Sequence, residues 1–561
     1  MKHINKLLTV ILLLTGFTIS AQVAPHKYFV EFKDKNQNPY SLSHPEQFLS
    51  PRAIQRRQTM GIGYDISDLP VTPAYVQAIR DLGAQVLNPT KWLNGVTIKL
   101  TDTTLINSIK QLSFVKSVVN HSGVKSSSAE PTGKFGLENE LIPFVSSSNS
   151  PKSANGYNYG ESYAQIHMLN GDVMHQNGFR GQGIVIAQLD AGFYKFPVNP
   201  AFDSLRANNQ VLGYKDFVKD GYGIFTDKTD QHGMWVLSIM AGIIPGHLIG
   251  SAPKASFWQL KTEELHLEYE IEEYNWVSGA EFADSVGADI ITSSLGYTVF
   301  DSTYLDHTCS EMNGHTTVGS RGANFAFSKG IMVIVSAGNE GNNTNWHCVS
   351  SPADADYALA CAAVDENGVR GSFSSLGVDT AGRVKPNIAA MGVMTVHSDS
   401  SGFMSRGSGT SFSAPMIAGM TACLMQAKPG YPNTFYKTAI ERSCSHFSSP
   451  DSLTGFGIPD FVKAMNIMGT TDINKSNDLS IFPNPVCDRF KLQITSGQSQ
   501  TAVLTLINSL GQVSLRREIM LRAGENELLI NDLRDLAAGV YILVFDSGSM
   551  HSTSRIVKLP L

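Results

Sequence analysis

The chain has 561 residues, of which 43 are Lys or Arg and 49 are Asp or Glu, so its formal net charge is −6. A chain of this length exceeds one hydrophobic core, and we expect three or four domains. The slightly acidic balance argues against nucleic-acid binding, because nucleic acids are bound by clustered Lys and Arg side chains.

Residues 1–21 are typical of a secretory signal peptide. A basic start with Lys2 and Lys6 is followed by the apolar run 7–19, and Ala21 supplies a small residue at the expected cleavage point. The apolar run is too short to span a bilayer comfortably, and no later segment reaches membrane-spanning length. The sequence therefore predicts an exported protein with no membrane-spanning segment.

Residues 22–120 predict a small α+β unit. Pro73 at the start and Gly83 at the end bound one of its helices. The expected elements are strands over 28–32, 84–87, 96–100 and 115–119, and helices over 45–61, 72–82 and 103–112. Residues 121–155 are rich in Ser, Asn, Gly and Pro and lack periodicity, which predicts a linker.

Residues 156–468 alternate short apolar runs with helical patterns. The expected strands are 184–189, 255–260, 288–292, 331–335 and 357–364, and the expected helices include 271–286 and 318–329. This alternation predicts an α/β fold, with a parallel sheet covered by helices on both faces. In such folds the functional residues lie in loops at the carboxyl ends of the strands.

The segment 407–415, Gly-Ser-Gly-Thr-Ser-Phe-Ser-Ala-Pro, places Ser411 at the start of an apolar helix. A serine there gains the positive end of the helix dipole and a free backbone N–H beside its own oxygen. These features suit a nucleophile whose attack forms an oxyanion. Serine alone is a poor nucleophile, so it requires a base and an orienting acid.

Candidate partners for Ser411 lie upstream. Asp190 ends a predicted strand, His232 precedes an apolar helix, and Asn339 follows the strand 331–335. Each residue also has a structural interpretation when taken alone. Asp190 could cap a strand end, His232 could be an ordinary helix N-terminal residue, Asn339 could occupy a left-handed turn and Ser411 could be an N-cap.

Taken together, these residues resemble the subtilisin-like serine proteases, which have Asp, His, Asn and Ser in this chain order. Ser-Ala-Gly-Asn at 336–339 and Gly-Thr-Ser-x-Ser-Ala-Pro at 409–415 are its most specific motifs here. The resemblance implies that Ser411 attacks the peptide carbonyl while His232 takes its proton. It implies that Asp190 holds the imidazole tautomer and that Asn339, with the Ser411 amide, stabilises the oxyanion.

The same resemblance implies a substrate-binding strand. Ser294, Leu295 and Gly296 match the family segment that lines the cleft and pairs with the peptide backbone. Two positions depart from the family pattern, which more often has Thr or Ser after the catalytic Asp and Thr two residues after the catalytic His. Ala191 and Met234 occupy these positions. Neither position relays protons, but we expect a bulkier and less polar active-site wall near Met234.

Residues 22–120 resemble the propeptide of this family, which assists folding and occupies the cleft as an intramolecular inhibitor until it is removed. A small accessory domain that stays attached is the alternative.

All six cysteines lie after residue 300. Six cysteines allow fifteen disulfide pairings, and the sequence does not choose among them. Cys309 and Cys348 flank the unit that delivers Asn339, which favours that pair. A metal site built from these cysteines with His307 and His347 is an alternative. Cys423 lies within the apolar helix that Ser411 starts, which we call the serine helix, and is expected to be a buried thiol.

An acidic run follows the strand 255–260. Its members are Glu263, Glu264, Glu268, Glu270, Glu272 and Glu273. The simplest interpretation is a solvated face. A preference for basic peptides and a structural calcium ion are alternatives, although no calcium loop is recognisable. We therefore predict no metal in the catalytic site and no cofactor for the chemistry.

After a polar linker at 469–478, residues 479–561 predict an antiparallel β-sandwich. Its expected strands are 479–482, 490–494, 502–507, 512–517, 525–530, 539–545 and 554–558. Phe-Pro-Asn-Pro at 482–485, Gly-Val-Tyr-Ile-Leu at 539–543 and the basic end resemble the sorting domain of the type IX secretion system. That resemblance implies passage across the outer membrane, followed by release or attachment to the cell surface. A generic immunoglobulin-like binding module is the alternative.

The prediction is therefore a secreted serine endopeptidase that is made as a precursor and acts on protein or peptide substrates. A non-catalytic surface adhesin on a degenerate protease fold is the competing class, but a binding scaffold has no need of all four site residues. An esterase would carry its nucleophile in Gly-x-Ser-x-Gly with the acid and the histidine after it, and the chain order here is reversed.

Overall fold

The computed structural model describes residues 22–23, 26–124, 139–141, 157–219, 221, 223–264, 267–377, 382–471, 480–482, 486, 488–496, 498–508, 512–547 and 551–559. The chain divides into two compact units, Met1–Asn466 and Ile467–Leu561. The predicted signal peptide, most of the linker 121–155 and all but three residues of the linker 469–478 lie outside the described residues.

The N-terminal region, residues 26–124, forms an antiparallel sheet of order β3-β4-β2-β5. These strands are β3 (Gln85–Thr90), β4 (Gly95–Lys99), β2 (Lys27–Phe32) and β5 (Val115–Asn120). The helices α2 (Pro73–Asp81) and α3 (Ile106–Lys110) contribute Val76, Ile79 and Ile109 to the core that these strands share. The four predicted strands and the helix predicted over 72–82 are confirmed here, with boundaries shifted by a few residues, and α3 forms the central part of the helix predicted over 103–112.

The helix predicted over 45–61 is two separate segments. A short 3-10 turn, η1 (Pro45–Gln47), precedes α1 (Pro51–Met60). The Ser50 side chain accepts a hydrogen bond from the Ala53 N–H and caps α1, and Pro51 sits at its first position. Proline disfavours helical geometry in the residue before it, so the break at Ser50 has a local cause.

The central region carries the predicted parallel sheet, which has seven strands in the order β16-β15-β14-β13-β8-β12-β9. These are β16 (Ile388–Met391), β15 (Leu359–Val364), β14 (Met332–Ser336), β13 (Ile290–Ser293), β8 (Val185–Asp190), β12 (Ser256–Lys261) and β9 (Val211–Asp216). Every pairing among them is parallel. The two edge strands, β9 and β16, were not predicted from the sequence.

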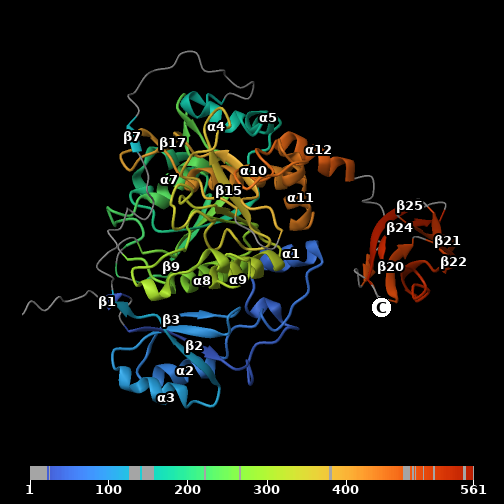
Figure 1. Cartoon of the computed structure of the whole chain (residues 1–561), viewed down its shortest axis with the longest axis horizontal. Helices are drawn as coiled ribbons and strands as arrows, with labels where there is room; N and C mark the ends of the chain where they lie inside the picture. Colours follow the sequence, from blue (N-terminus) through green and yellow to red (C-terminus); the bar gives the residue numbers. More distant parts are fainter. Residues whose placement is uncertain are drawn as a thin grey trace, which may run out of the picture. The chain divides into compact units, whose positions relative to one another are not determined.

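Helices cover this sheet as expected. α10 (Thr410–Ala427) packs on β13, β14 and β15 and against α7 (His232–Ala241). α8 (Ile271–Val286) and α9 (Val318–Ser328) lie side by side, and α8 also contacts β3 of the N-terminal region (Figure 1). The N-terminal region therefore docks onto the helical layer formed by α8 and α9.

Part of the predicted linker pairs close to the serine helix. β7 (Asn139–Leu141) pairs antiparallel with β18 (Met404–Gly407), and β18 pairs with β17 (Thr395–Ser398). Since β18 ends three residues before α10, this small sheet borders the start of the serine helix.

The second unit contains the predicted antiparallel strands. One sheet has the order β19-β20-β23 and the other β22-β21-β24-β25. The strands are β19 (Ser480–Phe482), β20 (Phe490–Ser496), β21 (Gln500–Asn508), β22 (Val513–Leu521), β23 (Gly524–Ile530), β24 (Gly539–Asp546) and β25 (His551–Lys558). Side chains from both sheets, including Phe490, Leu504 and Phe545, share one core. α12 (Phe461–Thr471) extends into the start of the predicted linker.

Within the described residues, no helix combines the length and the apolar character needed to cross a membrane.

Candidate active site

Asp190 is the last residue of β8, whose residues are all buried. The backbone N–H of Thr262 donates to the Asp190 carbonyl oxygen at 3.0 Å, so strand pairing continues to the end of β8. The Asp190 side chain is fully buried. In this low-dielectric setting its hydrogen bonds are stronger than they would be in water.

His232, the first residue of α7, lies directly against this carboxylate. Its Nδ1 is 2.6 Å from Asp190 Oδ1, and both side chains are buried. A carboxylate only accepts hydrogen bonds, so Nδ1 donates the proton and Nε2 is left as the basic nitrogen. Gly233 permits this approach, because a Cβ there would lie 2.5 Å from the Gly192 carbonyl oxygen and 3.0 Å from Asp190 Cβ. The structure therefore brings together two of the predicted catalytic residues.

Gln188 orients the same carboxylate and was not among the predicted site residues. Its Nε2 donates to Asp190 Oδ2 at 3.2 Å and to the Gly233 carbonyl oxygen at 2.7 Å. The Ala191 N–H donates to Asp190 Oδ1 at 2.9 Å. A glutamine inside an otherwise apolar strand, two residues before Asp190, was the signal that could have identified it, since residues two apart on a strand share a face.

Ser411 lies in the first turn of α10 and is buried. Its hydroxyl donates to the Ser294 carbonyl oxygen at 3.3 Å, while the Ser294 hydroxyl donates to the Ser411 carbonyl oxygen at 2.9 Å. Pro415 explains the second bond. Proline has no N–H, so the Ser411 carbonyl lacks its usual partner four residues on and accepts from Ser294 instead.

Asn339 follows β14 in a tight turn at Gly338, whose φ of +108° favours glycine. Asn339 Oδ1 accepts from the Thr410 N–H and the Thr410 hydroxyl, both at 2.9 Å. With Oδ1 held by Thr410, the Nδ2 donor lies on the opposite edge of the amide. The start of the serine helix therefore fixes how Asn339 presents its N–H groups.

The predicted substrate segment begins where β13 ends. Ser294 and Leu295 are buried and Gly296 is exposed, and the three residues lie outside any strand. Gly296 is required by close packing, since a Cβ there would lie 2.9 Å from Ser350 Cβ. The double hydrogen bond of Ser294 with Ser411 joins this segment directly to the serine helix.

Met234 does not lie where we expected it. The side chain is fully buried and its Sδ accepts from Asn199 Nδ2 at 3.4 Å, so it packs inside the molecule and forms no exposed wall. Helix α7 is buried on almost every side. A side chain two residues after His232 therefore points into the core.

Cys309 and Cys348 form a disulfide with a Cα–Cα distance of 6.0 Å, as the sequence favoured. Because both thiols are consumed, the alternative metal site that used these cysteines with His307 and His347 is wrong. His307 Nε2 instead lies 3.2 Å from Glu273 Oε2. Cys423 is a buried free thiol, as expected.

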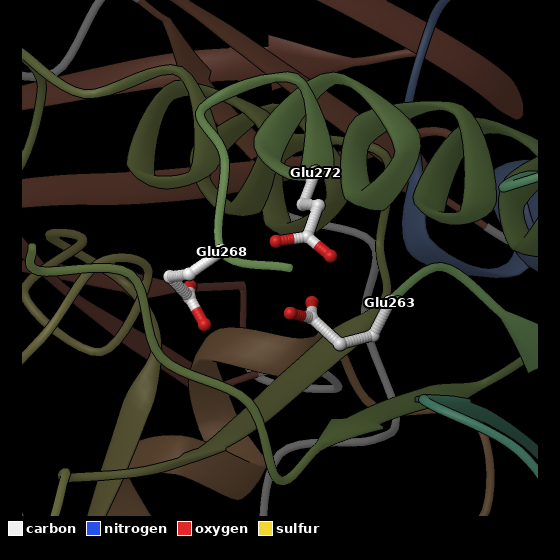
Figure 2. Close-up of side chains that lie close together, drawn as sticks. All are labelled: Glu263, Glu268 and Glu272. Atoms are coloured by element: carbon white, nitrogen blue, oxygen red, sulfur yellow. The ribbon is translucent and has the colours of Figure 1, made fainter. Parts of the chain in front are cut away.

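The acidic run is not a solvated face. Glu263, Glu272 and Glu273 are almost completely buried. One ligand oxygen from each of Glu263, Glu268 and Glu272 lies within 4.8 Å of the others, and Figure 2 shows the three carboxyl groups converging. The Tyr297 hydroxyl donates to Glu263 Oε2 at 2.9 Å, and burial followed by the charge of Glu263 raises the pKa of Tyr297. Carboxylate oxygens of this kind are ligands that a hard cation prefers.

The N-terminal region meets α8 through buried charges. Asp284 of α8 accepts from Arg56 at 2.6 Å, from Arg57 at 2.9 and 3.0 Å and from Lys91 Nζ at 2.8 Å. Glu281 of the same helix accepts the backbone N–H groups of Lys91 and Trp92 at 2.8 and 2.9 Å. Two carboxylates on one helix thus hold both an arginine-bearing helix and a loop of the N-terminal region.

Family models match three parts of the chain. The model described as "Subtilase family" matches residues 181–457, and "Peptidase S8 propeptide domain, Bacteroidota" matches residues 27–134. "Secretion system C-terminal sorting domain" matches residues 480–559. These three segments correspond to the central region, the N-terminal region and the second compact unit.

The curated relatives include several subtilisins. Subtilisin NAT of Bacillus subtilis subsp. natto is 27% identical over 286 residues, which cover 51% of this chain and 66% of the relative. Subtilisin of Bacillus pumilus is 26% identical over 286 residues, covering 51% and 92%. Minor extracellular protease Epr of Bacillus subtilis is 23% identical over 411 residues, covering 69% and 58%. The match therefore spans just under two thirds of the first of these relatives.

Among solved structures, the prenylagaramide maturation protease PagA is 22% identical, with a TM-score of 0.41, over 53% of this chain and 97% of that protein. The parallel sheet, the four motifs in family order and the matched family models agree. Residues 181–457 of the chain therefore form a subtilase domain, with a propeptide domain before it and a type IX sorting domain after it.

Proposed function

We propose that this chain is the precursor of a secreted serine endopeptidase. One observation carries the proposal: His232, paired with the buried Asp190 at 2.6 Å, is the first residue of α7, which packs against α10, the helix that has Ser411 in its first turn. A neutral imidazole whose Nδ1–H is held by a carboxylate is oriented to act as a base through Nε2. The proposed domains of the precursor are the signal peptide 1–21, the propeptide 22–120, the catalytic domain 156–468 and the sorting domain 479–561, with linkers at 121–155 and 469–478.

In the proposed mechanism, rotation about χ1 of Ser411 breaks the hydrogen bond from Oγ to the Ser294 carbonyl oxygen. Oγ then donates its hydrogen bond to His232 Nε2 instead. Oγ attacks the peptide carbonyl carbon as Nε2 takes its proton. His232 then gives that proton to the leaving amine, and an acyl-enzyme forms. Water, deprotonated by His232, attacks the ester carbonyl, and His232 returns that proton to Ser411 Oγ as the acid product leaves.

The oxyanion formed at each step is assigned to Asn339 Nδ2 and the Ser411 backbone N–H. Thr410 holds the opposite edge of the Asn339 amide, which supports a donor that is in place before charge develops. Ser294, Leu295 and Gly296 are assigned to the peptide backbone of the substrate. Their place beside Ser411 and outside any strand supports that role.

The N-terminal region is proposed to act as the intramolecular inhibitor of the central region. The buried ion pairs with Asp284 support a tight complex before removal. The sorting domain is proposed to direct passage through the type IX secretion machinery, with release or surface attachment afterwards. Deleting residues 470–561 should leave the protein in the periplasm, and unchanged secretion would contradict the assignment.

The central test is Ser411→Ala in the full chain. This variant should lose casein hydrolysis, self-processing and labelling by a fluorophosphonate. Ser413→Ala is a matched control on the same helix, because the Ser413 hydroxyl donates to the Thr410 carbonyl oxygen at 2.8 Å and is buried. It should retain the label. A parent protein that takes no label would contradict the proposed function and favour a non-catalytic scaffold.

A further inference from the structure

A chain of four rings connects the proposed base to the residue after the proposed nucleophile. The ring centroids of His232 and Trp235 are 6.5 Å apart, and those of Trp235 and His397 are 5.4 Å apart. His397 stacks on Phe412 with a centroid distance of 5.1 Å and an interplanar angle of 12°. The chain thus runs from α7 through β17 to the first turn of α10.

His397 is the central member of this chain and is fully buried. Its Nδ1 lies 3.2 Å from the Ser398 carbonyl oxygen. A carbonyl oxygen only accepts, so Nδ1 carries the proton. Nε2 is then a buried acceptor, and it has no hydrogen-bond partner among the described residues. The mechanism proposed above gives this imidazole no role.

Burial is the main cause that lowers the pKa of His397 to about 4, and the charge of His232 lowers it further. The ring is therefore neutral at neutral pH. This matters because His232 becomes positively charged during the proposed reaction. A neutral neighbour packs behind the proposed base without repelling that charge.

Gly407, at the end of β18, packs closely against the rings of both His397 and Phe412. A Cβ on Gly407 would lie 2.5 Å from Phe412 Cζ and 3.2 Å from His397 Nε2. The strand that carries His397 is also bonded to α7, since the Ser398 N–H donates to Ser238 Oγ at 3.0 Å. A shift of His397 would therefore move either α7 or the start of α10.

We propose that His397 is a positioning residue that holds the helix of His232 and the helix of Ser411 at a fixed separation through the rings of Trp235 and Phe412. This inference rests on the proposed function. It deepens that function by assigning the spacing of base and nucleophile to a residue that touches neither substrate nor reacting atoms. The stacked ring supplies the spacing, and the Nδ1–H bond to Ser398 fixes the plane of the ring.

The test compares His397→Leu, which removes the ring, with His397→Phe, which keeps it. Each full-length variant is allowed to mature, and its active sites are titrated with a fluorophosphonate. A displacement of about 1 Å in a reacting group can cost roughly 100-fold, so we expect kcat per titrated site to fall roughly 10- to 100-fold in His397→Leu. KM should change little, and the fluorophosphonate reaction rate should fall with kcat. His397→Phe should recover most of both rates.

His175→Leu is the matched control for losing a buried histidine. His175 is also fully buried, with a pKa lowered to about 4 mainly by burial, and its ring stacks on Tyr159. Its nitrogens contact the Tyr159 hydroxyl and the Ser251 carbonyl oxygen. His175→Leu should lower thermal stability without lowering kcat per titrated site.

Trp235→Leu and Trp235→Phe give a second comparison at a less buried member of the chain, in case His397→Leu fails to fold. The leucine variant should lose kcat and the phenylalanine variant should recover it. Unchanged kcat per titrated site in the leucine variants, or a loss that phenylalanine does not restore, would overturn the inference. A parent that takes no label would overturn the proposed function, and with it this inference. A labelled parent with unaffected variants would overturn the inference alone.

Discussion

Asp284→Asn offers a sharp test of how the propeptide is held. Asp284 is fully buried in α8, and its three cationic partners, Arg56, Arg57 and Lys91, all belong to the propeptide. Burial would raise the pKa of Asp284, but the charges of Lys91, Arg57 and Arg56 outweigh it and hold that pKa well below its usual range. The substitution keeps the shape of the side chain and removes its charge.

The expected magnitude follows from these contacts. Removing one partner of a buried ion pair costs about 3–5 kcal/mol, because the remaining charge stays buried without compensation. Arg57 keeps a bond to Asp68 at 2.9 Å, and Lys91 keeps one to Ser285 at 3.4 Å, so we take the lower end. At about 1.4 kcal/mol per tenfold change, a loss of about 3 kcal/mol corresponds to a Kd roughly 100-fold higher.

The assay uses the processed protein, in which the cleaved propeptide is still bound. Serial dilution restores activity near the Kd of the complex, so Asp284→Asn should regain activity at roughly 100-fold higher concentration than the parent. Lys116→Met is the control, since its ion pair with Glu31 is exposed and lies within the propeptide. An exposed pair of this kind contributes at most about 1 kcal/mol, so its removal should leave release unchanged.

Equal dilution curves for Asp284→Asn and the parent would refute this reasoning. That result would mean that the apolar contacts of the interface, and not its buried charges, determine how tightly the propeptide binds.

Three further predictions concern the central region. Asn339→Ala should lower kcat roughly 100- to 1,000-fold with little change in KM, because it removes one oxyanion donor; an equal rise in KM would contradict that role. Replacing Cys309 and Cys348 by Ser should lower the free energy of unfolding by roughly 4 kcal/mol, since the disulfide closes a loop of 39 residues; an unchanged denaturation midpoint would exclude this. Burial alone would lower the pKa of His307, but the hydrogen bond and charge of Glu273 raise it above 6.5. The raised pKa means that His307 stabilises the fold below about pH 6.5 and that this stabilisation is lost as pH rises through the folded-state pKa. His307→Gln should therefore reduce Tm more at about pH 5.5 than at about pH 9, and an equal reduction at both would refute the pairing.

The sequence alone predicted the elements whose signal is local. The strands near Asp190 and Asn339 are continuous apolar runs because parallel strands are buried on both faces. The sequence also bounded α8 and placed Ser411 at the start of a buried helix. Edge strand β9 was not predicted because Gly213, Lys215 and Asp216 interrupt its apolar pattern, as an edge position with no fully buried residue allows.

Only the tertiary structure decided the partners of charged and polar side chains. Charge alone predicts that the acidic run after β12 is solvated, but Glu263 and Glu272 are buried. Their burial depends on which helices and loops fold over this segment, and the local sequence does not show that. The same holds for Gln188 beside Asp190, for Asp284 among propeptide cations and for His397 between two helices. Local patterns determine which residues form helices and strands, whereas contacts between residues far apart in the chain determine the electrostatic environment of each side chain.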